Sequence, residues 1–415
     1  MGRDQDVRRA VADAHRREWA FVLAATARVA GDIDLAEECV QDAYVSALDA
    51  WTRDGVPNNP GAWLTVAARR RAIDAHRRDR TLRTKLPLLV SPDGDEAPEP
   101  EVQEPSVIED DRLRLVFTCC HPALAREAQI ALTLRLVCGL TTDEIAQAFL
   151  VSETTMAARV TRAKKKITAA RVPYRVPAEA DLPERLDAVL TVVHLLFTTG
   201  HTAPSGSELV RADLVDRALQ LTRMLHQLMP DEREVRGLLA LLLLTDARRA
   251  TRTGPDGRLL LLEEQDRSRW DFDGIAEGQR LVVEALRGGR PGRFTLQAAI
   301  AALHAEAPSY AETDWLQVLR LYDELIRVWP SPVVALNRAV ALSMVDGPVA
   351  ALSELAILED DGRLAGYRYL YATKADLLNR LGKREDAAEA YRAALALTDN
   401  TQEREFLARR LAEIC

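Results

Sequence analysis

The sequence predicts an all-α protein of several domains. Its 415 residues exceed the usual size of one domain. Apolar residues recur at helical spacing along most of the chain, for example over 213–228 and 315–328. Only 258–262 offers a weak alternation typical of a strand. The apolar run 238–244 is too short to span a bilayer and is flanked by charges, so we expect it in a buried helix and expect no membrane partner.

The N-terminal part predicts a helix with one apolar and one acidic face over 33–51. Its apolar side chains keep the spacing of a single helix face, and the intervening positions are acidic. A turn at 57–61 ends this helix, and a second helix starts at Ala62. Trp63 could offer its ring for stacking on a partner, but a tryptophan just after a turn is more often a core anchor, which we favour. The apolar positions are Leu35, Cys39, Val40, Ala43, Tyr44, Ala47, Leu48 and Trp51.

Positive charge is concentrated in two separate segments. From Arg69 to Lys85 the chain has eight Arg or Lys against two Asp, although the whole chain carries a formal net charge of -8. From Arg159 to Arg175 there are seven cations and no acid. An acidic protein that gathers cations in two helices is expected to bind a polyanion there, so we predict two DNA contacts.

An acidic linker separates these two segments. Between Pro92 and Asp111 the chain has nine carboxylates and four prolines, with little apolar surface to bury. We therefore place a domain boundary over 89–111. The segment is either a solvated spacer or an acidic strand that mimics nucleic acid and occupies a channel built for it.

The segment 140–167 predicts a helix-turn-helix. Thr142 is the expected N-cap of the first helix, whose core face carries Ile145, Ala146 and Phe149. Ser152 is the expected N-cap of the second helix, which has an inward apolar seam and outward cations suited to phosphates. A surface hairpin with a solvated lysine run is the plainer alternative.

Together these motifs resemble the extracytoplasmic-function sigma factors of bacterial RNA polymerase. The sequence Asp34-Leu35-Ala36-Glu37-Glu38 resembles their region two core-binding helix. The run Asn59-Pro60-Gly61-Ala62-Trp63-Leu64, with the basic helix after it, resembles their promoter-melting segment, and 140–167 resembles region four. The three motifs appear in the order of the family, over roughly the first 170 residues.

This resemblance implies partners and site residues. The acidic helix would bind core RNA polymerase, the basic helix would hold the minus-ten promoter element, and the second helix of the hairpin would enter the major groove of the minus-thirty-five element. The expected polymerase-binding residues are Asp34, Glu37, Glu38, Gln41 and Asp42. The expected DNA-binding residues are Arg69, Arg70, Arg71, Asp74, Arg77, Arg78 and Arg80 in the basic helix, with Ser152, Thr154, Thr155, Ala158, Arg159, Arg162, Lys164, Lys165 and Lys166 in the hairpin.

The chain after Arg171 predicts a large helical extension. Helices are expected over 186–197, 213–228, 232–248, 278–287, 294–305 and 315–328. Ala350, Glu354 and Ile357 recur as Ala387, Tyr391 and Ala394, a shift of 37 positions that is similar to a tetratricopeptide repeat, with 402–414 as a capping helix. The extension resembles the tail of a sigma-factor subgroup with such repeats, so we expect it to regulate the sigma domains and to bind an unidentified protein or peptide.

The expected domains are 1–88, region two; 89–111, linker; 112–172, region four; 173–330, helical extension; and 331–415, repeats with a capping helix. No catalytic residue and no cofactor is expected, because no nucleophile, phosphate loop or convincing metal pattern is present. Cys119, Cys120, His121 and Cys138 could hold zinc, but buried thiols in a reducing cytoplasm are the favoured interpretation. The alternative functions are an operator-binding regulator that needs no polymerase and a tetratricopeptide adaptor.

Overall fold

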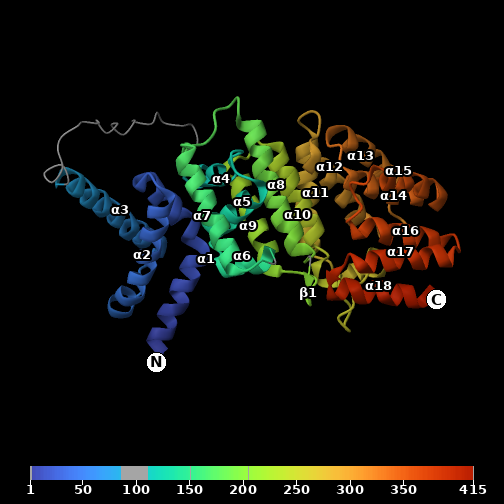
Figure 1. The fold of residues 1–415 in the computed structure, drawn as a ribbon, viewed down its shortest axis with the longest axis horizontal. Helices are drawn as coiled ribbons and strands as arrows, with labels where there is room; N and C mark the ends of the chain where they lie inside the picture. Colours follow the sequence, from blue (N-terminus) through green and yellow to red (C-terminus); the bar gives the residue numbers. More distant parts are fainter. Residues whose placement is uncertain (1, 86–110, 150, 204, 415) are drawn as a thin grey trace. The chain divides into compact units, whose positions relative to one another are not determined.

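A computed structural model describes residues 2–85, 111–149, 151–203 and 205–414. These residues form helices joined by short connections (Figure 1). Their contacts divide the chain into two compact units, Met1–Val192 and Val193–Cys415. The only sheet in the described ranges is a parallel pair of two-residue strands, β1 (Ser205–Gly206) and β2 (Asp399–Asn400). The all-α expectation is confirmed.

Three long helices open the first unit: α1 (Gly2–Ala30), α2 (Ile33–Asp54) and α3 (Pro60–Lys85). Each of them packs against the other two. Asp32 caps α2 by accepting a hydrogen bond from the backbone N–H of Leu35 at 2.9 Å. Trp51, at the end of α2, is fully buried and meets Trp63 of α3 edge to face, with ring centroids 5.8 Å apart. Trp63 therefore packs as a core anchor.

The helices α4 (Asp111–Cys119), α5 (Arg126–Leu132), α6 (Thr142–Phe149) and α7 (Glu153–Ala169) follow, with one π-helical turn, η2 (Thr133–Val137). Ser152 caps α7 as expected, accepting from the N–H of Thr155 at 3.2 Å. The cap of α6 is Thr141, one residue earlier than expected. Its hydroxyl accepts from the N–H of Glu144, whose carboxylate in turn accepts from Thr141, and this reciprocal pair fixes the helix start.

Of the expected linker 89–111, the structure describes Asp111 alone. Asp111 is the first residue of α4 and pairs with Arg114 at 3.0 Å and with Arg28 of α1 at 3.6 Å. The other eight carboxylates lie outside the described residues, so the proposed channel role of this segment stays a prediction.

The second unit holds the expected helices, and α8 runs across the division of the chain. Residues 258–262 form no strand, only an isolated bridge between Thr253 and Leu259. The helix expected from Gly278 begins six residues earlier, at Phe272, because Asp271 caps it. Gly278 packs so closely on Leu244 that a Cβ would lie 2.6 Å from that side chain. The helices are α8 (Leu182–His201), α9 (Ala212–Leu228), α10 (Arg233–Asp246), α11 (Phe272–Leu286), α12 (Arg293–Glu306) and α13 (Trp315–Val328), with single turns η3 (Arg249–Thr251), η4 (Leu262–Glu264) and η5 (Arg267–Arg269).

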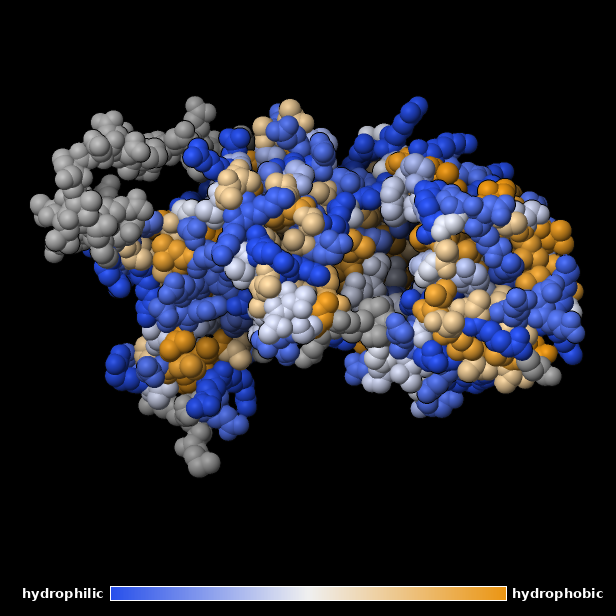
Figure 2. Space-filling model, in the orientation of Figure 1, coloured by the Kyte–Doolittle hydropathy of each residue, from blue (hydrophilic) through white to orange (hydrophobic). Residues whose placement is uncertain are grey.

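Helical hairpins end the chain, but the repeat register differs from the predicted one. The buried residues of α15 are Ala351, Leu355 and Leu358, one position later than expected, whereas Ile357 is 69% exposed. They match the buried Ala387, Tyr391 and Ala394 of α17 at a shift of 36. Figure 2 shows hydrophobic patches on the surface that these helices form. The elements are α14 (Pro332–Val345), α15 (Pro348–Asp361), α16 (Arg368–Arg380), α17 (Arg384–Ala396) and α18 (Thr401–Ile414).

Candidate functional site

The expected polymerase-binding residues on α2 divide into two groups. Glu38, Gln41 and Asp42 are exposed. Asp34 is also exposed at its side chain, 58%, whereas Glu37 is buried, with 7% of its side chain accessible. The helical repeat explains this division, because Glu37 follows the buried Ile33 by one turn.

Glu37 is neutralised by two cations from the helix-turn-helix part of the same unit. Its carboxylate lies 2.5 Å from Arg135 of η2 and 2.5 Å from Lys164 of α7. The Lys164 ammonium also donates to Asp34 at 2.7 Å. Burial alone would lower the pKa of Lys164, but the carboxylates of Glu37 and Asp34 outweigh it, and the net shift is upward. We call these four residues the α2–α7 clasp.

Further contacts hold α1 against η2 and against the segment that follows α7. Trp19 of α1 donates its indole N–H to the carbonyl of Leu136 at 3.0 Å, and the Tyr174 hydroxyl donates to the carbonyl of Ala24 at 3.0 Å. Gly139 has a φ of +71° and lies against Trp19, where a Cβ would approach the ring to 3.0 Å. The sequence reasoning missed Trp19, Arg135 and Tyr174. The lone Arg135 inside an apolar run was a usable signal, since a cation buried there needs a partner.

The cations of α3 also divide by direction. Arg69 donates to the carbonyl of Ala25 and Arg71 to the hydroxyl of Ser46, so both brace the three-helix bundle. Arg70 and Arg78 are exposed, as is Arg77, which lies 4.0 Å from the exposed Asp74. The side chain of Arg80 lies outside the described residues.

A pocket of about 350 Å³ lies where α2 ends and α3 begins. Trp51 and Trp63 form part of its wall, and Asp54 and Asn58 contribute polar groups. The connection between the helices turns at Gly55, whose φ of +90° favours glycine.

On α7 most of the expected DNA-binding residues are exposed. Arg159 is half-buried and lies over the ring of Phe149, 5.6 Å from its centroid. Lys164 does not face outward as expected, because it points into the α2–α7 clasp. The predicted apolar seam of Val160, Ala163 and Ile167 is buried, and Met156 is buried with it. The exposed residues are Ser152, Thr154, Thr155, Ala158, Arg162, Lys165 and Lys166.

The cysteines of the first unit are thiols in the protein core. Cys39, Cys119, Cys120 and Cys138 are buried and free. Burial raises the pKa of Cys120 to about 11, which keeps that thiol protonated and unreactive. Across the described ranges no three His, Cys, Asp or Glu side chains converge as a metal ion would require. Nor does any described helix combine the length and apolarity needed to cross a bilayer.

Comparison with known proteins matches three parts of the chain. Residues 14–81 match the model of sigma-70 region 2, and residues 114–167 match that of sigma-70 region 4. Residues 185–286 match a family of unknown function, DUF6596. An uncharacterized protein of Rhizobium meliloti (strain 1021) is 44% identical over 388 residues, which cover 93% of this chain and 91% of that protein.

The two sigma-70 matches fall on the helices that carry the candidate surfaces. Residues 14–81 include α2 and most of α3, and residues 114–167 include α6 and almost all of α7. The operator-binding regulator and the adaptor are not favoured by these matches. The chain belongs to the sigma-70 family as an extracytoplasmic-function-like sigma factor with an additional C-terminal helical domain, and it directs promoter-specific transcription initiation with core RNA polymerase and promoter DNA as its partners.

Proposed function

We propose that this sigma factor binds core polymerase through the exposed face of α2. Glu38, Gln41 and Asp42 supply its polar side chains. Val45 and Leu48 lie on the same helix and are 63% and 38% exposed, although both are large and apolar. An apolar centre beside polar groups is the usual composition of a protein interface.

We propose that α3 holds the minus-ten promoter element with one mixed face. Val66, Arg70, Ile73 and Arg77 are spaced as one side of a helix, and all four are exposed. The arginines suit phosphates and the apolar side chains suit unstacked bases. The pocket beside Trp51 and Trp63 would receive one extruded base, which supports a role in promoter melting.

For the minus-thirty-five element, the N-terminal turns of α7 present small hydroxyl side chains and Arg162. Thr154, Thr155 and Ala158 leave space for close approach to base edges, while Lys165 and Lys166 suit phosphates further along the helix. The Ser152 cap and the acidic first turn of α6 keep this helix-turn-helix rigid.

The α2–α7 clasp carries the main proposal: the described arrangement is a closed form of the sigma factor. In it, Asp34 and Glu37 of the polymerase-binding helix are occupied by Lys164 of the DNA-binding helix. Polymerase and promoter therefore compete with the internal ion pairs. Removing one partner from a buried ion pair costs about 3–5 kcal/mol, so opening requires replacement cations for Glu37. A basic surface on polymerase would supply them.

The test compares Lys164→Met with Lys165→Met, two neighbouring lysines on α7 of which only Lys164 joins the clasp. Binding of core polymerase is measured by fluorescence anisotropy, and binding of promoter DNA is measured separately. Lys164→Met should bind core more tightly, by up to about ten-fold, which corresponds to about 1.4 kcal/mol. Lys165→Met should bind core like the parent and lose DNA affinity. Weaker binding of core by Lys164→Met would contradict a closed form.

We propose that the C-terminal unit regulates the sigma domains and has its own partner. A helical unit with a repeat surface can bind a protein or peptide, and it is large enough for an independent core. A cut after Arg171 would remove Tyr174 and Arg185, which bond to Ala24 and Phe117 in the first unit. The cut therefore belongs after His201, where α8 ends, so that the fragment keeps each of its helices whole. Transcription in vitro by this fragment separates the roles: higher activity indicates inhibition by the C-terminal unit, lower activity indicates a required contact, and equal activity contradicts regulation.

A further inference from the structure

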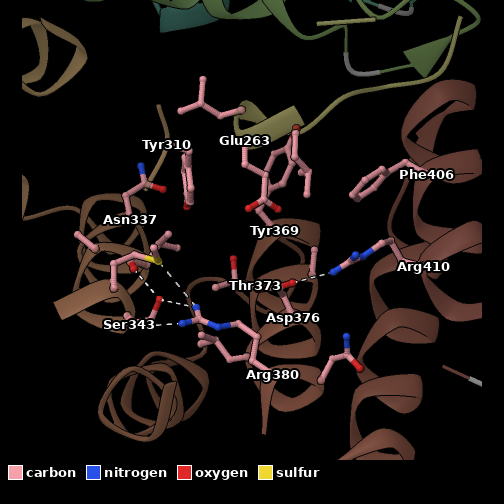
Figure 3. A pocket seen from close by; sticks show the side chains of 18 of the residues that line it. Glu263, Tyr310, Asn337, Ser343, Tyr369, Thr373, Asp376, Arg380, Phe406 and Arg410 are labelled. Atoms are coloured by element: carbon pink, nitrogen blue, oxygen red, sulfur yellow. Dashed lines mark hydrogen bonds and ion pairs between the residues drawn. The ribbon is translucent and has the colours of Figure 1, made fainter. Parts of the chain in front are cut away.

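The C-terminal unit contains a cavity of about 770 Å³ (Figure 3). Its walls come from η4 and the segment before it, from α12 and the connection to α13, and from α13, α14, α16, α17 and the last helix, α18. This volume lies within the range of about 300–1,000 Å³ that small-molecule sites occupy. No part of the sigma function described above uses it.

One wall of the cavity is aromatic. Tyr310 and Trp315 meet edge to face with ring centroids 5.0 Å apart, and Tyr322, Tyr369 and Phe406 continue the lining. Aromatic side chains offer a ligand large apolar contact area with few rotatable bonds. This wall suits the apolar part of an organic ligand.

Several neutral polar groups of the lining have no hydrogen-bond partner in the described part of the chain. They are the hydroxyls of Tyr310, Tyr322 and Thr373 and the side-chain amides of Asn337 and Asn379. Figure 3 shows Tyr310, Asn337 and Thr373 around the same space. Hydroxyls and amides that lack protein partners are suited to the alternating N–H and C=O groups of a peptide backbone.

Most charges of the cavity are already matched. Arg410 pairs with Asp376 at 2.9 Å, and Arg368 pairs with Glu403 at 2.8 Å. Arg380 is different: its guanidinium is held by the hydroxyl of Ser343 at 3.1 Å and by the Ser343 carbonyl at 3.3 Å, both neutral acceptors. Arg380 is exposed where it lines the cavity, and no described carboxylate forms an ion pair with it, so its guanidinium is available to an anionic ligand group.

A carboxylate without a cation lies on the opposite side of the cavity. Glu263 forms no ion pair with any described residue, and Figure 3 shows it across the cavity from Arg380. Both groups act on the Tyr310 hydroxyl: burial, Glu263 and Asp376 raise the pKa of Tyr310, and Arg380 opposes them. The cavity therefore offers one unmatched positive and one unmatched negative group, separated by aromatic rings and neutral polar groups.

We propose that this cavity binds a short peptide with free termini. The peptide carboxylate faces Arg380, and its ammonium group faces Glu263. Its backbone bonds to the unpaired amides and hydroxyls, and its apolar side chains cover the aromatic wall. The site lies outside the matched sigma-70 regions. This inference rests on the partner proposed above for the C-terminal unit and gives that partner a chemical class.

The probes are Ala-Xaa-Ala tripeptides with Xaa varied over the apolar residues, titrated into the full-length protein by calorimetry. Each peptide is used with free termini, with an acetylated N-terminus and with an amidated C-terminus. At least one free peptide should bind with a Kd below about 1 mM. Blocking either terminus should weaken binding by about ten-fold or more. The proposal is overturned if no free peptide binds at about 10 mM, ten-fold above that Kd limit. It is also overturned if the blocked peptides bind as tightly as the free ones.

Substitutions at Arg380 and Glu263 test which side chain binds which terminus of the peptide. Arg380→Ala should erase the preference for a free carboxylate and leave the preference for a free ammonium, whereas Arg380→Lys should retain both. Glu263→Gln should do the reverse of Arg380→Ala. Arg363→Ala is the control, because Arg363 is an exposed arginine of the same unit outside the cavity lining. Equal effects of Arg363→Ala and Arg380→Ala contradict the assignment, and circular dichroism verifies that each variant is folded.

Discussion

Glu37 is buried, although the other carboxylates of α2 are exposed. Its acidic neighbours predict an exposed polymerase contact, and the family resemblance assigns it that role. In the structure it is the most buried carboxylate of α2 and is held by Arg135 and Lys164. A sequence pattern reports the side of a helix, but a partner 127 residues away in the chain can cover that side.

This placement changes the experiment that tests α2. Reversing Glu37 to Lys would put a third cation beside Arg135 and Lys164 and damage the fold. Reversing Glu38 and Asp42, which are exposed, should instead remove core-polymerase binding. Thermal unfolding should stay within about 1 kcal/mol of the parent, because the surface ion pair of Asp42 with Arg71 at 3.7 Å contributes little. Co-purification with core polymerase measures the binding. If the doubly reversed protein still co-purifies fully, α2 is not the docking surface.

A substitution at Gly139 gives a second prediction for a single residue. Gly139→Ala should destabilise the first unit, because the residue has a positive φ and because its new Cβ would approach Trp19 to 3.0 Å. Gly31→Ala is the matched control, with a φ of +66° and no atom within 4 Å of the added Cβ. Urea unfolding should show Gly139→Ala less stable than Gly31→Ala by about 1 kcal/mol or more. Equal losses in the two variants would show that the approach to Trp19 is unimportant.

In α3, some arginines are exposed for DNA binding and others hold the helix against its neighbours. Arg70→Ala should weaken promoter binding and reduce its salt slope by about one, because one phosphate contact is lost. Arg71→Ala should instead lower stability, because Arg71 donates to Ser46 on α2 at 2.6 Å. Salt-dependent filter binding and thermal unfolding distinguish the two. An equal salt slope in Arg70→Ala and the parent contradicts the role of this face.

The positions of the helices were the most predictable part of the fold. The helices of the second unit lie close to their expected ranges because helical periodicity and caps are local signals. The errors have local causes too: reciprocal bonds move the α6 cap to Thr141, and Asp271 starts α11 before its apolar face begins. The shift of the repeat from 37 to 36 arose because neighbouring apolar residues on α15, such as Ile357 and Leu358, fit either register until burial separates them. The cavity was not predictable, since its lining comes from separate segments between Leu259 and Arg410.

For the whole molecule, buried histidines predict how stability depends on pH. Burial, together with nearby arginines, lowers the pKa of His194 and of His304 to about 4. In an unfolded chain histidine titrates near 6.5, so between those values the unfolded state binds more protons and stability falls as pH falls. Each histidine contributes about 1.4 kcal/mol per pH unit in this window. Urea unfolding of His304→Gln between pH 7 and 5 should show a correspondingly flatter slope, and a slope equal to that of the parent contradicts the shift.

As a whole, this sigma factor is proposed to open its α2–α7 clasp when it initiates transcription with core polymerase. Core RNA polymerase is mixed with the full-length protein and with fragmented genomic DNA, and the 5′ ends of the transcripts are mapped. We expect discrete start sites that core alone does not produce, each preceded by shared minus-ten and minus-thirty-five elements. Lys164→Met should give more product than Lys165→Met. A pattern of start sites identical to that of core alone would contradict it.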